Sequence, residues 1–237
     1  MIKSPGYASG VGLDLHIRTT RVDNPTAKYS FISGIAIKIG TDILEVTADG
    51  AMVINGDLTD DKIVSFSGHP LKRTLEGTKK RIVVYELNLA HDNETKLFQI
   101  RANTRTGMLF ADANGFLLPD SVGLMGNPAM KDTLMARDGV TDLAGYWNAF
   151  GEEWQVQSNE PKLFQEHRTP QHPSGCRYEK TGKASQKGRR RLLADSGVDI
   201  EVATKACAKW QGYKKDFCIE DVMVTGDTEL AKDSFYH

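Results

Sequence analysis

Short segments that alternate apolar and polar residues follow one another from residue 12 to about residue 113, and this pattern restricts the fold more than any other feature. Leu13, Leu15 and Ile17 alternate with polar neighbours, which is the period-two pattern of a half-buried strand. Turn signals rich in Gly, Asp and Asn separate the segments. The segments predicted to form strands are 13–18, 29–39, 43–46, 52–54, 80–89, 97–100 and 108–110.

The close spacing of these segments favours antiparallel sheets. Parallel strands need crossover connections of a dozen or more residues, usually helices, and the chain between these segments has no room for them. Closely spaced strands without helices between them are typical of an antiparallel sandwich or meander. The sequence therefore predicts a mainly β fold, an antiparallel β-sandwich or meander, with a small helical region at its C-terminal end.

Size and charge exclude some classes of partner. The 237 residues suffice for one large β domain, or for one domain with a small satellite. The formal net charge is -1, so no overall field attracts nucleic acid or an anionic membrane. No apolar run approaches the ~20 residues that a membrane-spanning helix needs. We expect neither nucleic acid as a partner nor a membrane span.

The sequence changes character after residue 119. Residues 120–156 have the composition of an ordered, loop-rich segment that lies over the sheets. Trp147 and Trp154 are expected to anchor this segment to the core, because aromatic side chains bury a large apolar area. The β domain is therefore expected to span residues 1–157.

A linker and a helical region are expected to follow the β domain. Residues 158–197 contain several prolines and many polar residues, as linkers do. The basic run at 187–191 is either an accessible processing site or solvated charge, and the sequence leaves both interpretations open. Residues 198–237 form the small helical, cysteine-containing region. Helices are predicted over 198–210, 214–224 (with Gly226 as its C-cap) and 228–236.

Three patches of sequence occur in a characteristic order. They are 122–127 (VGLMGN) with 149–156 (AFGEEWQV), 49–56 (DGAMVING), and the cysteine-containing residues 206–223. In this order they resemble the type D domain of von Willebrand factor-like extracellular proteins. Residues 134–141 are especially similar to the divergent form of this domain in unicellular algae.

The resemblance implies interaction and not catalysis. It implies a secreted module for adhesion or matrix-type assembly, with other extracellular proteins or glycans as partners. Residues 1–6 contain no signal peptide, and the opening strands of the family have no counterpart here. We therefore expect an N-terminally truncated sequence with a signal peptide upstream, although the N-terminus alone fits a cytosolic protein as well. Asn93, in an Asn-Glu-Thr triplet, is the expected N-glycosylation site.

The chain contains three cysteines, and their number alone does not separate an oxidising compartment from a reducing one. The resemblance implies that Cys207 and Cys218 pair locally. It also implies that Cys176 stays unpaired, because its partner belongs to the missing early strand. The family's Cys-Gly-Leu-Cys cysteines are Val122 and Met125 here, so packing has to replace disulfides at that corner. Three unpaired thiols remain the alternative.

Calcium is the one cofactor that the resemblance suggests. Type D domains bind Ca²⁺ in the loop after Gly-Asn, through side-chain and backbone oxygens. Asn127 matches this position, and Asp132 lies where a later carboxylate ligand falls. Between them, residues 128–131 lack the family's other oxygen ligands, and Lys131 adds a repelling charge. The alternative is that Asn127 and Asp132 only fix a turn.

The sequence contains no recognisable catalytic motif. Zinc-protease, nucleophile-elbow, phosphate-loop and dinucleotide signatures are missing from it, and the histidines are scattered. His16 shares a strand face with Asp14 and Arg18, which predicts a solvated or ion-paired surface. We expect a protein that is not an enzyme. The alternative functions are a carbohydrate-binding β-sandwich module and a hydrolytic enzyme.

The cysteine hypothesis predicts a thiol titre. Titration of the purified, denatured protein without reductant is expected to find a single free thiol, that of Cys176, because Cys207 and Cys218 are joined. After reduction the titre rises to all three cysteines. Three free thiols before reduction would contradict the pairing.

Overall fold

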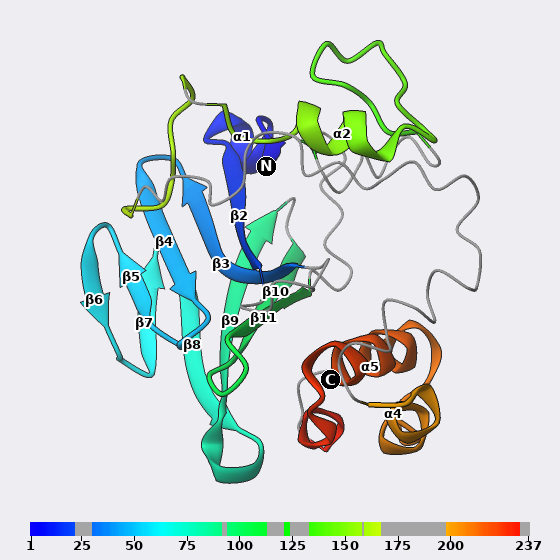
Figure 1. The fold of residues 1–237 in the computed structure, drawn as a ribbon. Helices are drawn as coiled ribbons and strands as arrows, with labels where there is room; N and C mark the ends of the chain where they lie inside the picture. Colours follow the sequence, from blue (N-terminus) through cyan, green and yellow to red (C-terminus); the bar gives the residue numbers. More distant parts are fainter. Residues whose placement is uncertain are drawn as a thin grey trace.

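The structure, a computed structural model, describes residues 1–21, 30–91, 94–112, 121–123, 133–157, 159–166 and 198–232. Within these ranges the chain forms two antiparallel sheets that share one core, with helices towards the C-terminal end (Figure 1). The predicted mainly β, antiparallel sandwich with a small C-terminal helical region is confirmed.

The first sheet contains seven strands within the described ranges and follows the chain order except at one edge, where β12 lies beside β1. A two-residue turn joins β5 to β6, and its residues Asn55 (φ 51°) and Gly56 (φ 99°) have the left-handed conformations that an Asn-Gly hairpin turn requires. In spatial order the strands are β12 (Val122–Gly123), β1 (Ile2–Ser4), β2 (Leu13–Arg21), β3 (Ser30–Ile39), β4 (Asp42–Thr47), β5 (Met52–Ile54) and β6 (Asp57–Thr59).

The second sheet is a five-stranded antiparallel meander within the described ranges. A short loop connects its first strand to β6, so β6 and β7 are the edge strands at the same side of the sandwich (Figure 1). Its strands are β7 (Ile63–Phe66), β8 (His69–Glu76), β9 (Ile82–His91), β10 (Glu94–Asn103) and β11 (Met108–Asp112).

The core lies between the sheets and follows the alternation of the sequence. Ile35, Ile37 and Ile39 of β3 are each at most 2% exposed, and Tyr85 and Leu87 of β9 are each 1% exposed. All five belong to one apolar cluster that draws on both sheets. The residues between them face outwards, so each sheet has a second face that other parts of the chain can cover.

Strand β8 was not predicted from the sequence. Its side chains on the core side begin with Leu71, which is 1% exposed, but the next position is Arg73, which breaks the apolar alternation. The outer side is polar: Lys72 Nζ lies 3.3 Å from Glu86 Oε2, and Glu76 Oε2 lies 3.0 Å from Arg101 Nη1. Cross-strand ion pairs and pairing with β9 therefore define a strand that periodicity alone does not reveal.

The C-terminal helices cover the outer face of the second sheet (Figure 1). Their apolar side chains cluster with Ile82 and Val84 of β9 and with Met108 of β11. The sequence predicted helices here but not the surface on which they pack, and Gly226 (φ 69°) is the expected left-handed C-cap. The elements are α4 (Ile200–Ala206), α5 (Gly212–Thr225) and the 3-10 helix η2 (Thr228–Ala231).

A disulfide and a buried tryptophan hold these helices together. Cys207, which follows α4, is joined to Cys218 of α5, and both are fully buried. The indole N–H of Trp210 donates to the carbonyl oxygen of Ala231 at 3.1 Å. The helical region therefore has its own covalent and hydrogen-bonded closure in addition to its contact with the sheet.

Three short helical segments of the described ranges lie among or beside the strands, namely α1 (Tyr7–Gly10), η1 (Thr78–Lys80) and α2 (Trp147–Glu153). In α1, Tyr7 is fully buried, and its hydroxyl group lies 3.3 Å from Nε2 of His69 in β8. This contact ties the start of the chain to the second sheet.

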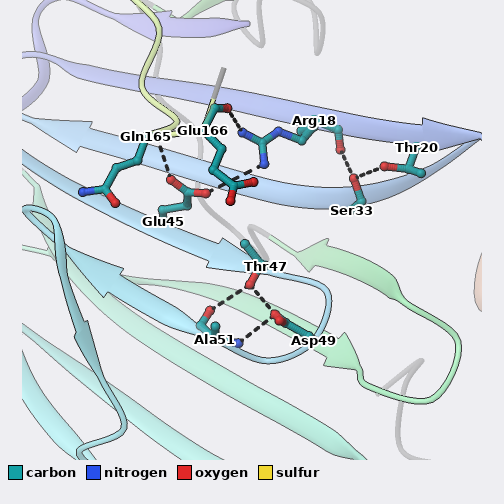
Figure 2. A network of polar contacts seen from close by, with 9 residues as sticks. All are labelled: Arg18, Thr20, Ser33, Glu45, Thr47, Asp49, Ala51, Gln165 and Glu166. Carbon is teal, nitrogen blue, oxygen red and sulfur yellow. Dashed lines mark hydrogen bonds and ion pairs between the residues drawn. The ribbon is translucent and has the colours of Figure 1, made fainter. Parts of the chain in front are cut away.

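A tight turn after β4 brings the two sheets into direct hydrogen-bonding contact. The hydroxyl group of Tyr85 donates to the carbonyl oxygen of Gly50 at 2.6 Å. Thr47 and Asp49 bond to each other across this turn, and the backbone N–H of Ala51 donates to Asp49 (Figure 2). Gly50 has φ of +79°, and a Cβ atom there would lie 2.8 Å from Cγ2 of Val83.

We expect Gly50→Ala to destabilise the fold more than Gly107→Ala. Both glycines have positive φ, but a Cβ at Gly107 meets nothing within 4 Å, whereas one at Gly50 collides with Val83. Strain at positive φ costs about 1 kcal/mol at either site, and the collision adds about 1–3 kcal/mol at Gly50 alone. Urea unfolding of both variants measures the difference, and equal losses would contradict the packing of this turn.

Candidate functional site

Residues 159–166, here called the strap, cross the outer face of the first sheet. These residues were predicted to begin a linker, but Leu163 is only 6% exposed. His16 and Arg18 of β2 and Glu45 of β4 bind the backbone of the strap. The part of the chain that packs on this sheet therefore extends beyond residue 157. The strap makes the outer face partly an interior surface.

The polar contacts that hold the strap run from side chains to backbone. The N–H of Gln165 donates to Oε2 of Glu45 at 3.0 Å, and Nη2 of Arg18 donates to the carbonyl oxygen of Glu166 at 2.6 Å (Figure 2). The N–H of Leu163 lies 3.4 Å from Nδ1 of His16, which accepts its hydrogen bond. Because these bonds depend on particular side chains, docking of the strap is specific to this face.

An aromatic contact adds to these bonds. The guanidinium group of Arg18 lies 4.0 Å from the centroid of the Phe164 ring, within the range of cation–π attraction. The same ring lies over Gly34 of β3, where a Cβ atom would be 3.0 Å from Phe164 Cε1. A glycine at this position therefore lets the ring approach the sheet closely.

The expected exposure of His16 was wrong. Its neighbours on this face, Asp14 and Arg18, are polar, but the strap covers His16 and leaves it 4% exposed. Burial lowers the pKa of His16 from 6.5 to about 4. The ring is therefore neutral at neutral pH, and Nδ1 is an acceptor because it receives the N–H of Leu163.

A cavity of about 480 Å³ lies beside the strap, between it and strands β4 and β5; it is called the strap cavity below. This volume falls within the ~300–1,000 Å³ of typical ligand sites. Its apolar lining comes from Ile43, Val53 and Leu163. Its polar lining comes from Thr41, Asp42, Glu45, Asn55 and Gln165.

The polar groups of the cavity take part in structural bonds. Glu45 is 6% exposed and accepts the N–H of Gln165, and its Oε1 lies 3.9 Å from Nη1 of Arg18. Asp42 Oδ1 accepts a hydrogen bond from Asn55 Nδ2 at 3.0 Å. Asn55 Oδ1 in turn accepts the N–H of Ile43 at 2.7 Å. These bonds fix the positions of the two carboxylates before any ligand arrives.

Trp154 is buried as expected, but in a cluster of its own with Met1 and Phe150 and not in the core between the sheets, and the side chain of Trp147 lies outside the described part of the chain. Trp154 is 3% exposed and clusters with Phe150, and its indole N–H donates to the carbonyl oxygen of Met135 at 2.9 Å. Arg137 lies over the Trp154 ring and donates from Nη1 to Glu160 Oε1 at 2.5 Å. Through Glu160, this cluster fixes the first residues of the strap.

Most of the site residues expected from the sequence lie outside the described residues. This holds for Asn127 and Asp132 of the calcium site, for Cys176, for Asn93 and for the basic run at 187–191. In the described ranges, no three or more His, Cys, Asp or Glu side chains are grouped so as to hold a metal ion. The expected pair Cys207 and Cys218 is joined by a disulfide.

Comparison with models of protein families finds no match to the chain, and comparison with curated proteins finds none either. The likeness to the type D domain therefore stays a prediction. A bilayer-spanning helix is not found among the described residues, whose helices are too short or too polar for it.

The strap and its partners were not predicted from the sequence. Two signals were present: Leu163 and Phe164 form an apolar pair inside a polar segment, and Gly34 interrupts an otherwise apolar strand. A glycine inside a strand often marks a close approach of another part of the chain. Neither signal says which segment approaches, so Glu45 could not be identified as part of a site.

His16 is expected to make stability depend on pH. Its pKa is 6.5 in the unfolded chain and about 4 in the folded protein, so between these values the unfolded chain binds a proton that the folded protein does not. The free energy of unfolding should therefore decrease as the pH falls from about 6.5 to about 4, by about 3 kcal/mol for this group. Its contribution is complete above this window and lost below it.

Denaturant unfolding at several pH values measures this effect. His16→Gln keeps an acceptor oxygen but does not titrate, so its free energy of unfolding should vary less across the window than that of the unmodified protein. Burial also lowers the pKa of His69, so some dependence of the same sign remains in the variant. Identical profiles for the two proteins would contradict the burial of His16 under the strap.

Proposed function

We propose that this chain is a non-catalytic interaction module of the extracellular space, of the kind used in adhesion or matrix assembly. The observation that carries the proposal is the strap cavity: a concavity of about 480 Å³ with apolar lining and with polar groups already fixed by structural bonds. Sites that bind a partner combine these two properties.

The bonding of the titratable groups supports binding over catalysis. General acid–base catalysis needs a group that is free to exchange a proton with the substrate. His16 uses its acceptor nitrogen for Leu163, and its low pKa keeps it neutral. Glu45 is held by the backbone N–H of Gln165 through Oε2 and is paired with Arg18 through Oε1. Both His16 and Glu45 therefore hold the strap in place. A ligand in the cavity would contact a carboxylate whose position these bonds already fix.

An exposed apolar residue extends the surface around the cavity. Leu58 of β6 is directly opposite Val53 of β5 in the sheet register, so both lie on the same face, and Val53 lines the cavity. Leu58 is 74% exposed. Apolar side chains beside a partly polar concavity are typical of surfaces that bind other proteins.

The disulfide supports the extracellular part of the proposal. Disulfides persist in oxidising compartments and are rare in the cytosol, and Cys207 and Cys218 are joined. The ordered patches that resemble the type D domain point in the same direction. Other extracellular proteins are the proposed partners.

One observation favours carbohydrate binding as a second function. Tyr213 of α5 is 60% exposed and makes an edge-to-face contact with Phe217, which is 46% exposed. Exposed aromatic side chains can cover the apolar faces of sugars. The two rings are tilted by 76° to each other, so together they do not form a flat platform, and protein binding remains the first proposal.

Leu58→Ser is expected to weaken partner binding about tenfold, whereas Ile63→Ser leaves it unchanged. Ile63 is a matched control: it is 71% exposed, on the edge strand β7 of the other sheet. Both variants should fold normally because both side chains are exposed. The measurement is binding to arrayed extracellular matrix proteins and glycans, together with a panel of hydrolase substrates.

Four outcomes of this experiment would count against the proposal. Turnover of a hydrolase substrate would favour the enzyme alternative. Binding confined to glycans and lost in Tyr213→Ala would favour the carbohydrate alternative. Unchanged binding in Leu58→Ser would place the partner elsewhere, and equal loss in Ile63→Ser would mean that binding is not specific to the surface around the cavity.

A further inference from the structure

The charged residues that line the strap cavity are both acidic. Two carboxylates, of Asp42 and Glu45, line it, and the described residues contribute no lysine, arginine or histidine to the lining. Two described cations lie beside the lining: Lys38, which is opposite Ile43 in the sheet register, and Arg18, whose Nη1 is 3.9 Å from Glu45 Oε1 and whose Nη2 donates to Glu166. At 3.9 Å, Arg18 and Glu45 form an ion pair that is too long for a hydrogen bond, so Arg18 offsets charge while Oε1 of Glu45 stays able to accept a hydrogen bond.

Both carboxylates keep an oxygen that can accept further hydrogen bonds. Glu45 Oε2 accepts the N–H of Gln165, and Oε1 makes no hydrogen bond within the described ranges. Asp42 Oδ1 accepts from Asn55, and for Oδ2 no hydrogen bond to a described residue exists. Glu45 is also 94% buried, with 6% of its surface exposed, and a hydrogen bond to a carboxylate in such an environment is stronger than one in water.

The rest of the lining suits an aliphatic chain. Ile43 and Val53 of the strands and Leu163 of the strap contribute apolar surface to the same cavity as the two carboxylates. Lysine and arginine side chains combine a methylene stem with a charged end, and they bury the stem along apolar surface. An anion would be repelled by two carboxylates, and a sugar would find no aromatic ring among the described lining residues.

We propose that the strap cavity binds an ammonium or guanidinium group carried on an aliphatic stem. This inference rests on the proposed function and names the chemistry that its site recognises. The cation can belong to a lysine or arginine side chain of a partner protein, or to a free aliphatic amine. The shared feature is a positive end that reaches Asp42 and Glu45 while the stem contacts Val53 and Leu163.

A ligand titration followed by ¹H–¹⁵N NMR tests the inference with the whole chain. The probes are Nα-acetyl-lysine methylamide, Nα-acetyl-arginine methylamide and 1,5-diaminopentane. The control probe is Nα-acetyl-norleucine methylamide, which has the stem without the charge. The cationic probes should shift the backbone amides of Ile43, Gln165 and their neighbours, and the norleucine derivative should bind at least about tenfold more weakly.

A pair of variants localises the binding. Asp42→Asn removes the charge but keeps the oxygen that accepts from Asn55, so the fold is retained and affinity for the cationic probes should fall about tenfold. Asp60→Asn removes an equal charge from the loop between β6 and β7, outside the lining, and should leave affinity unchanged. Equal weakening by both variants would mean non-specific charge attraction and would overturn the inference.

The remaining outcomes separate this inference from the proposed function. Absence of shifts with every cationic probe, or equal affinity for the norleucine derivative, overturns the cation site, and neither result needs a variant. Protein binding that still depends on Leu58 would then leave the proposed function standing. Affinity for the amino-acid derivatives but not for the diamine identifies a protein side chain as the source, and the reverse identifies a free amine.

Discussion

Burial of alternate side chains between two antiparallel sheets is the interaction on which the other parts of the structure depend. Ile35 and Ile37 of β3 share one apolar cluster with Tyr85 and Leu87 of β9, and all four are at most 1% exposed. Because successive side chains of a strand point to opposite faces, this core also fixes which residues face outwards. The positions of Glu45 and of the outward-facing side chains of β9 follow from the same register.

The two outer faces are covered by different physical means. Helices α4 and α5 cover the second sheet through apolar packing around Val84. The strap covers part of the first sheet through bonds from His16, Arg18 and Glu45 to its backbone. A buried polar group without a partner costs about 1–3 kcal/mol, so burial of these side chains and docking of the strap require each other.

The strap cavity is a consequence of this second arrangement. The backbone of the strap is held at a few points by side chains, so it does not fill the space against the sheet as a paired strand would. The cavity left there lies between Leu163 and Gln165 of the strap and strands β4 and β5. Glu45 both holds the strap and lines the cavity. A ligand that contacts Glu45 therefore contacts a group on which the docking of the strap depends, which couples binding to the position of this segment.

The sequence by itself determined the elements whose residues interact locally or in a regular period. Alternation identified β3 and β9, the Asn-Gly pair identified the turn at Gly56, and Gly226 identified the end of α5. It did not identify β8, because Arg73 interrupts the alternation, and it gave none of the candidate site. The tertiary structure decided the site, because whether an outward-facing side chain is buried or exposed depends on which distant segment packs on it. His16 and Leu163 are 147 residues apart in the sequence, and no local pattern at either position records that they meet.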